Sequence, residues 1–538
     1  MEFNLADLFE AIVDTVPSAE ALVCGDGERP LRRADYAELD ARANQFARVL
    51  VRLGIGRDDH VGLHLHNGHE FVEAMLACYK LRAVPVNVNY RYVADELDYL
   101  VRDADLRVVV TEPRLSGALD ALRGRSSPLD AIVEVGPALD RMLAGESAER
   151  PDIGPRSADD RYVLYTGGTT GPPKGVVWRH EDIYFAALGG RGTPRRGVPP
   201  LTHPREIVER VRRGDPIMRR LPLCPLIHGG AMWVALQTLL NGGALVLDTS
   251  THFSAPTAVG LLSDERVELT MLIGDATARP IADELAADAR SSVPRYDLSA
   301  LQVIASGGAV LSAAVVEQLR ELLPQVSVID TFGASETGGQ GRLRGRSADG
   351  RPRLVTDEHT AVLDDDLVPV APGQVGRLAR SGNIPLGYHG DPVRTAATFP
   401  VVDGVRWSVP GDMARLEDDG TITVLGRGST SINTGGEKVF PEEVENVLKG
   451  HPAVFDALVV GAPDERYGEM VVAVVALRDA SVDDPGDEAL ATHVRAHLAG
   501  YKVPRGWIRV DRCERLPTGK PDYAWARHVA AMLVTKLQ

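Results

Sequence analysis

The sequence predicts an α/β fold with a large N-terminal part and a small C-terminal α+β part. Short apolar runs such as Val84–Val88 alternate with helical stretches such as Glu70–Lys80. Strands that alternate with helices indicate βαβ units and mostly parallel sheets. The length of 538 residues exceeds the size at which one hydrophobic core keeps growing, so two or more domains are expected. A change in composition near Arg427–Ser429 predicts domains over residues 1–427 and 428–538.

The elements of the N-terminal part are predicted from the spacing of apolar residues. A first helix with one buried stripe is indicated by residues that recur at helical spacing, namely Leu5, Leu8, Phe9, Ile12, Val13 and Val16. Alternation over His60–His66 predicts a strand, and Val108–Val110 predicts another. The strand–helix–strand order returns over three consecutive segments, Leu301–Ala305, Ser312–Leu323 and Val326–Asp330.

The C-terminal part is predicted to combine strands and helices. Pro441 followed by Glu442 and Glu443 indicates a helix start, because proline suits the first helical position and acidic residues favour the positive end of the helix dipole. Three strands and a second helix complete this part, over Ala457–Val460, Met470–Leu477, Trp507–Val510 and Asp487–Leu498 respectively.

Net charge and composition exclude several classes of protein. A formal net charge of −16 argues against nucleic-acid binding and against binding to anionic membranes. The N-terminus is acidic and amphipathic rather than a signal peptide, and no apolar run approaches the roughly 18 residues that span a bilayer. The four cysteines are scattered without a C-x-x-C pair, which is typical of a reducing compartment. We therefore expect a cytoplasmic protein without a membrane span.

A glycine-rich segment over residues 164–178, LYTGGTTGPPKGVVW, is the strongest local signal. Its glycines leave backbone N–H groups uncovered, so the loop can wrap an anion, and Lys174 adds a full positive charge. We predict a polyphosphate site directly after a buried strand that ends at Leu164. A nucleotide-kinase P-loop is excluded, because the lysine of that motif opens directly into a helix, whereas Lys174 lies between Pro173 and Gly175.

This segment resembles the phosphate loop of the adenylate-forming superfamily, which includes acyl-CoA synthetases, peptide-synthetase adenylation domains and beetle luciferases. The resemblance covers nearly the whole chain, and the other motifs follow in the family's order. It implies a large adenylate-forming domain followed by a small, mobile C-terminal domain. It also implies an ATP site that is formed by Thr166, Gly167, Gly168, Thr169, Thr170, Gly171 and Lys174. Thr170 is implied to be a metal ligand as well.

A second motif, PLCPLIHGGAMW over 222–233, resembles the family segment that borders the acyl pocket and the pantetheine channel. The resemblance implies a catalytic role for His228, although a lone histidine among apolar residues is more often a core residue. Gly229 and Gly230 leave room for a bulky acid, and the motif holds no acidic counter-charge for an amino group. A glycine pair, Gly307 and Gly308, follows a predicted strand and permits close approach of a flat base. The implied acyl pocket comprises His228, Gly229, Gly230, Gly308 and Gly333.

The segment DTFGASE over 330–336 resembles the family motif around the metal and the α-phosphate. A carboxylate suits Mg²⁺, and the resemblance makes Glu336 both the metal ligand and a catalytic residue. Ser335 replaces the usual threonine as a donor to the α-phosphate, and Phe332 keeps a face on which a base can stack. The implied nucleotide site is completed by Asp330, Thr331 and Gly333, together with Asp412 and Arg427 at the ribose.

Two C-terminal segments complete the resemblance. STSINTGGEKVFPEEVE over 429–445 resembles the family's hinge, at Ser429, and the contact with coenzyme A, at Asn433, Gly435 and Gly436. LPTGK over 516–520 resembles the P-x-x-G-K motif, which makes Lys520 the catalytic lysine.

The resemblance implies a ligase that uses ATP, Mg²⁺ and coenzyme A to convert a carboxylic acid into acyl-AMP and then into a thioester. Several segments look like actinobacterial fatty-acyl-CoA synthetases, some of which act on steroid side-chain acids. A hydrophobic and bulky acid is therefore expected, of a polycyclic, terpenoid, steroid or fatty type. Departures from the family at Gly167, Ser429 and Asn433 leave specialisation for one half-reaction open. A homodimer is also left open.

Other interpretations remain at this point. The chain could load acyl groups onto a carrier-protein phosphopantetheine, act as a luciferase-like monooxygenase, or bind an acyl nucleotide without catalysis. A segment with nine arginines between residues 190 and 220 is either a solvated excursion of the chain or a contact with the phosphates of coenzyme A.

Overall fold

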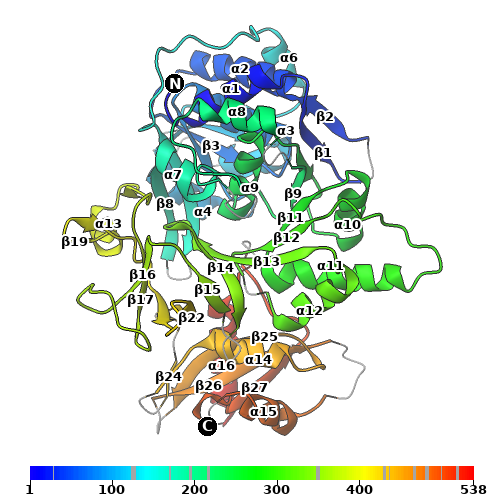
Figure 1. Ribbon diagram of the computed structural model, residues 1–538, viewed down its shortest axis with the longest axis vertical. Helices are drawn as coiled ribbons and strands as arrows, with labels where there is room; N and C mark the ends of the chain where they lie inside the picture. Colours follow the sequence, from blue (N-terminus) through cyan, green and yellow to red (C-terminus); the bar gives the residue numbers. More distant parts are fainter. Residues whose placement is uncertain are drawn as a thin grey trace.

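The computed structural model describes residues 1–27, 30–120, 122, 129–168, 171–192, 197–214, 218–309, 311–346, 352–427, 430, 432–434, 437–464, 468–478, 484–498, 500–516 and 520–537. Figure 1 shows a larger body that contains the N-terminus and a smaller body that contains the C-terminus. The sheets formed by β1 to β22 belong to the larger body, and β23 to β27 form the sheet of the smaller one.

The first sheet of the larger body is entirely parallel. Its strands lie in the order β4-β3-β5-β6, and a helix separates each strand from the next one along the chain. These βαβ units confirm the predicted fold class. The elements are β3 (His60–His64), α3 (His69–Lys80), β4 (Val84–Asn87), α4 (Ala94–Asp103), β5 (Leu106–Thr111), α5 (Pro113–Asp120) and β6 (Ala131–Glu134).

The second sheet is larger and has a parallel and an antiparallel part. Strands from β13 through β12, β11, β9 and β10 to β1 are parallel neighbours, as predicted for the α/β fold. The parallel strands are β1 (Glu20–Gly25), β9 (Arg220–Pro222), β10 (Leu245–Asp248), β11 (Leu269–Leu272), β12 (Val303–Ser306) and β13 (Ser327–Ala334). An antiparallel extension continues the sheet beyond β13, and no pattern in the sequence indicated it. The strands of this extension are β14 (Gly338–Arg346), β15 (Pro352–Val355), β16 (Thr360–Leu363), β17 (Val375–Arg380), β21 (Asp412–Leu416) and β22 (Ile422–Arg427). At the opposite edge of the sheet, β2 (Arg32–Asp35) pairs antiparallel with β1.

Helices cover both faces of the parallel part. In β10, Leu245 and Leu247 join a core cluster that includes α1, α2 and α9, whereas Val246 joins a cluster with α10, α11 and α12. Successive strand residues point to opposite faces, so each face of the sheet has its own core. The helices of this body not yet named are α1 (Leu5–Thr15), α2 (Tyr36–Arg52), α6 (Pro137–Ala144), α7 (His180–Ala187), α8 (Glu206–Arg213), α9 (Gly229–Leu239), α10 (Ala255–Asp264), α11 (Gly274–Ala289), α12 (Ala313–Leu322) and α13 (Pro392–Thr398).

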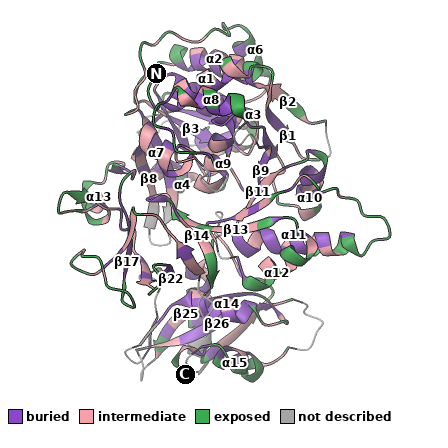
Figure 2. Cartoon of the chain, viewed as in Figure 1, coloured by how far each residue is buried: buried purple, intermediate pink, exposed green. Residues whose placement is uncertain are grey.

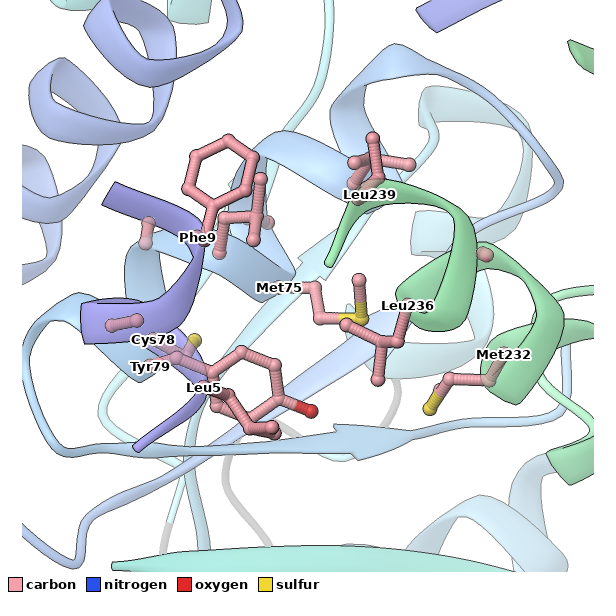
Figure 3. Packing of buried hydrophobic residues seen from close by; sticks show 14 of the residues in the cluster. Leu5, Phe9, Met75, Cys78, Tyr79, Met232, Leu236 and Leu239 are labelled. Atoms are coloured by element: carbon pink, nitrogen blue, oxygen red, sulfur yellow. The ribbon is translucent and has the colours of Figure 1, made fainter. Parts of the chain in front are cut away.

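Buried residues concentrate in the strands and on the inner sides of these helices (Figure 2). Figure 3 shows part of the largest cluster, where α1, α3 and α9 meet through Leu5, Phe9, Met75, Cys78, Tyr79, Met232, Leu236 and Leu239. The predicted first helix is confirmed as α1, and the side chain of Asn4 caps it by accepting hydrogen bonds from the N–H groups of Ala6 and Asp7. Among the described residues, none of the helices combines the length and apolarity needed to cross a membrane.

Two small sheets complete the larger body. A three-stranded sheet has the order β18-β8-β7, and its strands are β7 (Arg161–Gly168), β8 (Gly171–Arg179) and β18 (Gly387–Tyr388). A two-stranded ribbon consists of β19 (Val401–Val402) and β20 (Val405–Arg406).

The smaller body is one sheet with helices on both faces. Val459 of β25 packs with α14 and α15, whereas its neighbour Leu458 packs with α16. The predicted helix start at Pro441 is confirmed, and the domain boundary near Arg427–Ser429 stays a prediction. The elements are β23 (Ile432–Thr434), β24 (Glu437–Val439), α14 (Pro441–Lys449), β25 (Val454–Asp464), β26 (Gly468–Leu477), α15 (Asp487–Arg495), a 3₁₀ turn (Gly500–Lys502), β27 (Gly506–Val510) and α16 (Tyr523–Leu537).

Three buried histidines predict that the larger body loses stability in acid. Burial lowers the pKa of His64, His69 and His180 from 6.5 to about 4. The unfolded chain therefore binds more protons between these two values, so stability is complete above about pH 6.5 and is lost as the pH falls toward 4. We expect the melting temperature to decrease steadily over this range and the decrease to be smaller in His64→Asn. A variant that follows the wild-type curve at every pH contradicts this assignment.

Candidate active site

A cavity of about 300 Å³ lies where the two bodies face each other. The larger body contributes the ends of several strands, and the smaller body contributes α14 and the residues just before α16. The structure brings together around this cavity eleven of the residues that the motifs singled out: Thr166, Lys174, Gly308, Asp330, Thr331, Phe332, Gly333, Ser335, Glu336, Asp412 and Lys520.

The glycine-rich segment forms a hairpin. Strand β7 does not end at Leu164 as predicted but continues to Gly168, and β8 begins at Gly171, so that Gly168 pairs with Gly171. The strand was predicted to end early because glycine and proline are poor strand formers. The prediction was wrong, because backbone pairing with β8 extends the strand in spite of these residues. Thr169 and Thr170 lie outside the described residues. Gly167 is part of β7.

The hairpin places Thr166 directly opposite Lys174, at the wall of the cavity. Gly175 allows the arms to pack closely, because a Cβ atom there would lie 2.6 Å from the ring of Tyr165. Strand β18 lies beside β8 and brings Tyr388 to Lys174, with 4.9 Å between Nζ and the ring centroid.

Tyr388 also connects Lys174 to Glu336. Its hydroxyl donates a hydrogen bond of 2.9 Å to Oε1 of Glu336, and both residues are largely buried. Burial and the carboxylate raise the pKa of Tyr388, so its hydroxyl remains a donor at neutral pH. Tyr388 was not predicted from the sequence, since a single tyrosine outside the motifs carries no recognisable spacing.

The carboxyl end of β12 lies beside β13 at the cavity. Ser306 lies opposite Asp330 in their parallel pairing, and Thr331 Oγ1 donates a hydrogen bond of 2.8 Å to the carbonyl oxygen of Ser306. Ligands of α/β sheets bind beyond such strand ends. Gly308 has a φ of +78°, a conformation that favours glycine. A Cβ atom at Gly333 would lie 2.3 Å from the carbonyl oxygen of Gly338, so a larger residue has no room there.

Asp412 and Arg427 are cross-strand partners. They lie opposite each other in the antiparallel pairing of β21 and β22. Asp412 lines the cavity and is 6 % exposed, whereas the side chain of Arg427 lies outside the described residues. Their ribose contacts stay predictions.

The predicted acyl corner, which comprises His228, Gly229 and Gly230, lies at the start of α9. His228 is its half-buried N-cap residue, and neither His228 nor the glycines after it line the described cavity. A Cβ atom at Gly229 would lie 2.8 Å from Cδ2 of Leu164, whereas one at Gly230 would meet only Cε of Met271, at 3.6 Å. Gly229 therefore serves packing, and Gly230 has space. The same methionine would lie 2.9 Å from a Cβ atom at Gly307.

Asn87 links this corner to the hairpin. Its side-chain amide donates hydrogen bonds of 2.8 Å and 2.6 Å to the carbonyl oxygens of Tyr165 and Ile227, and its oxygen accepts one from the N–H of Tyr165. Asn87 is buried, and it fixes the chain before His228 next to the strand that carries Thr166.

Lys520 ends a turn that reaches the cavity from the smaller body. The N–H of Leu516 donates a hydrogen bond of 2.8 Å to the carbonyl oxygen of Lys520, and Arg515 pairs with Pro521 in an isolated bridge. On the hinge side, Asn433 lies in β23, but its side chain, Ser429, Gly435 and Gly436 lie outside the described residues. The contact with coenzyme A stays a prediction.

The residues present fit a magnesium ion held together with a nucleotide. Within the described ranges no three His, Cys, Asp or Glu side chains gather into a metal site of their own. Mg²⁺ commonly binds through one or two carboxylates and the phosphates of its substrate. Glu336 offers such a carboxylate at the cavity, and Tyr388 engages one of its two oxygens.

The arginine-rich segment divides between the surface and the interior. Arg205, Arg212 and Arg213 are exposed, which agrees with a solvated excursion. Arg210, by contrast, is 2 % exposed and donates hydrogen bonds to the carbonyl oxygens of Gly189 and Pro199. Arg195 and Arg196 lie outside the described residues.

Comparison with known proteins places the chain in a family. The family model described as "AMP-binding enzyme" matches residues 9–389, and that described as "AMP-binding enzyme C-terminal domain" matches residues 443–520. A 3-oxocholest-4-en-26-oate–CoA ligase of Rhodococcus rhodochrous is 45% identical over 98% of this chain and 96% of its own length. A medium/long-chain-fatty-acid–CoA/3-oxocholest-4-en-26-oate–CoA ligase of Mycolicibacterium smegmatis is 43% identical over 98% of this chain and 97% of its own.

Solved structures share the fold. The anthranilate CoA ligase AuaEII in complex with anthranoyl-AMP superimposes with a TM-score of 0.83 at 23% identity, over 99% of this chain and 98% of that one. A fatty acyl CoA synthetase of Mycobacterium tuberculosis gives a TM-score of 0.69 at 24% identity and 99% coverage of both chains. Fold and site together define an adenylate-forming protein. The chain belongs to the AMP-binding enzyme family.

Proposed function

We propose that this protein is an AMP-forming acid–thiol ligase that activates a bulky hydrophobic carboxylic acid and transfers it to coenzyme A. The observation that carries the proposal is the convergence of Lys174, Glu336, Asp412 and Lys520 on one cavity between the two bodies. A phosphate-binding lysine, a metal-binding carboxylate, a ribose-binding aspartate and a second lysine are the groups that acyl-adenylate formation needs.

In the first half-reaction an oxygen of the substrate carboxylate forms a bond to the α-phosphorus of ATP. The bond from that phosphorus to the bridging oxygen breaks, and pyrophosphate leaves with its electrons. Lys174 holds the β- and γ-phosphates from the hairpin, and Lys520 offsets the negative charge that develops between carboxylate and α-phosphate. A magnesium ion held by Glu336 and the phosphates would supply further positive charge. The protein thus acts by positioning and charge.

In the second half-reaction the thiolate of coenzyme A attacks the acyl carbon, and AMP leaves with the electrons of the acyl–oxygen bond. The proton of the thiol goes to solvent or to His228, which lies at the start of α9. One small body carries both Lys520 and the proposed coenzyme A contacts around Asn433. We therefore propose that it rotates about Ser429 between the two half-reactions, as other hinged enzymes do.

The class of acid is suggested by the relatives and by the acyl corner. The two ligases named above act on 3-oxocholest-4-en-26-oate, a steroid acid, and one of them also on fatty acids. A Cβ atom at Gly230 would meet only Met271, and this flexible methionine adapts its shape to what it contacts, which supports a bulky acid at this corner.

Gly230→Trp is expected to discriminate against ring acids. The indole would occupy the space next to Met271, so kcat/KM for a steroid side-chain acid should fall by at least about tenfold more than kcat/KM for a linear medium-chain acid. The comparison uses both acids with wild type and variant. Gly229→Ala is the control, since its Cβ atom meets Leu164 and should harm both acids alike. Equal losses for both acids in Gly230→Trp would refute the pocket assignment.

A carrier protein is the second candidate acceptor, since the pantetheine arm is the same in both. An assay with free coenzyme A and with a phosphopantetheine-loaded carrier protein separates the two. We expect thioester formation with free coenzyme A. Transfer to the carrier protein alone would replace the acceptor in this proposal but leave the adenylation step in place.

A further inference from the structure

The smaller body contacts α11 of the larger body through a β-bulge. In the pairing of β25 with β26 the register shifts between Val454 and Asp456, so that Phe455 is the extra residue. A bulge re-aims the side chain of the extra residue, and bulges are frequent beside active sites. Here the ring of Phe455 lies 5.6 Å from the guanidinium carbon of Arg279, on α11.

Arg279 is suited to receive an aromatic ring. It is 1 % exposed, and its Nη2 lies 3.1 Å from Oδ2 of Asp275, one turn earlier on α11. Within the described residues its Nε and Nη1 atoms have no hydrogen-bond partner. A desolvated guanidinium over an aromatic face is a favourable contact. The ring of Phe455 therefore compensates a buried cation of the larger body.

The residue after Phe455 holds the turn that carries Lys520. Arg515 donates a hydrogen bond of 2.6 Å to Oδ2 of Asp456, and Lys449 lies 3.2 Å from Oδ1. Burial would raise the pKa of Asp456, but these two cations outweigh it and keep the pKa below its ordinary value. Arg515 begins the turn that the hydrogen bond between Leu516 and Lys520 closes.

We propose that Phe455 and Asp456 are positioning residues for the first half-reaction. Phe455 docks the smaller body on α11, and Asp456 transmits that docking through Arg515 to the turn of Lys520. Because the two residues are adjacent in one strand, the docked pose and the position of Lys520 in the cavity are coupled. This inference rests on the proposed function, specifically on the role of Lys520 in forming acyl-AMP.

The test compares Phe455→Ala with Phe253→Ala, since the two phenylalanines are 39 % and 42 % exposed. Phe455→Ala should reduce pyrophosphate release by about tenfold, the scale of a lost desolvated cation–π contact, and leave thioester formation from supplied acyl-AMP unchanged. Phe455→Tyr keeps the aromatic face and should restore the rate. Phe253→Ala should change neither half-reaction. Like Phe455→Ala, Asp456→Asn should reduce pyrophosphate release and leave thioester formation from supplied acyl-AMP unchanged.

Lys520→Ala, measured in parallel, separates failure of this inference from failure of the proposed function. If Lys520→Ala abolishes pyrophosphate release but Phe455→Ala and Asp456→Asn do not reduce it, the inference is wrong and the proposed function stands. If Lys520→Ala releases pyrophosphate at the wild-type rate, the assignment of Lys520 and this inference both fail. Equal losses of both half-reactions in Phe455→Ala, with a lowered melting temperature, would show a merely structural role and overturn the proposal.

Discussion

Replacing Lys520 by alanine is expected to reduce acyl-AMP formation by about 10²- to 10³-fold, the scale of a lost group that stabilises transition-state charge. Lys520 is one of the cations that the smaller body presents to the cavity, and it ends the turn closed by Leu516. Thioester formation from supplied acyl-AMP should remain intact, because that step is proposed to use another face of the same body. The two half-reactions are measured separately, as pyrophosphate release and as thioester.

Arg512→Ala is the matched control for this variant. Arg512 is a cation of the same body, its side chain is 79% exposed, and it pairs with Glu514 without lining the cavity. It should leave both half-reactions at the wild-type rate. Ser429→Pro, which stiffens the proposed hinge, is expected to spare acyl-AMP formation and to slow thioester formation. Ser429 lies outside the described residues. If Lys520→Ala damages both half-reactions equally, the division of labour is wrong.

Glu336→Gln is expected to slow adenylation by about 10²-fold or more. The amide keeps the size of the side chain and can still accept the hydrogen bond of Tyr388. The loss of rate therefore measures the contribution of the negative charge that Glu336 offers to Mg²⁺. The magnesium concentration needed for half-maximal pyrophosphate release should rise at the same time. Both quantities come from one titration of Mg²⁺ at saturating ATP.

Tyr388→Phe separates charge from positioning at Glu336. It removes the hydrogen bond to Oε1 but leaves the carboxylate, so we expect a smaller loss than in Glu336→Gln. An unchanged rate of pyrophosphate release in Glu336→Gln would exclude Glu336 from the metal site.

The motifs singled out some of the charged residues that line the cavity. Lys174, Glu336, Asp412 and Lys520 each stand in a segment with a recognisable pattern, and their order along the chain matched a family. The alternation of strands and helices predicted the parallel sheets, since periodicity reports on burial directly. The individual roles of these residues remain predictions.

Other features depend on tertiary pairing that no local pattern encodes. Tyr388 reaches Glu336 only because β18 pairs with β8, far away in the sequence. The bulge at Phe455 arises from the register of two strands, and Arg279 stands inside a helix without any motif. The end of β7 was misplaced because propensity disfavours glycine in strands, although the partner strand overrides that preference.

A single incubation tests the central claim, that the cavity makes acyl-AMP and passes the acyl group to coenzyme A. The protein is supplied with a steroid side-chain acid, Mg²⁺, ATP and coenzyme A, and the products are quantified together. We expect AMP, pyrophosphate and acyl-CoA in equal amounts, and we expect acyl-AMP to accumulate when coenzyme A is omitted. Formation of ADP and phosphate, or a thioester that forms without release of AMP, would contradict it.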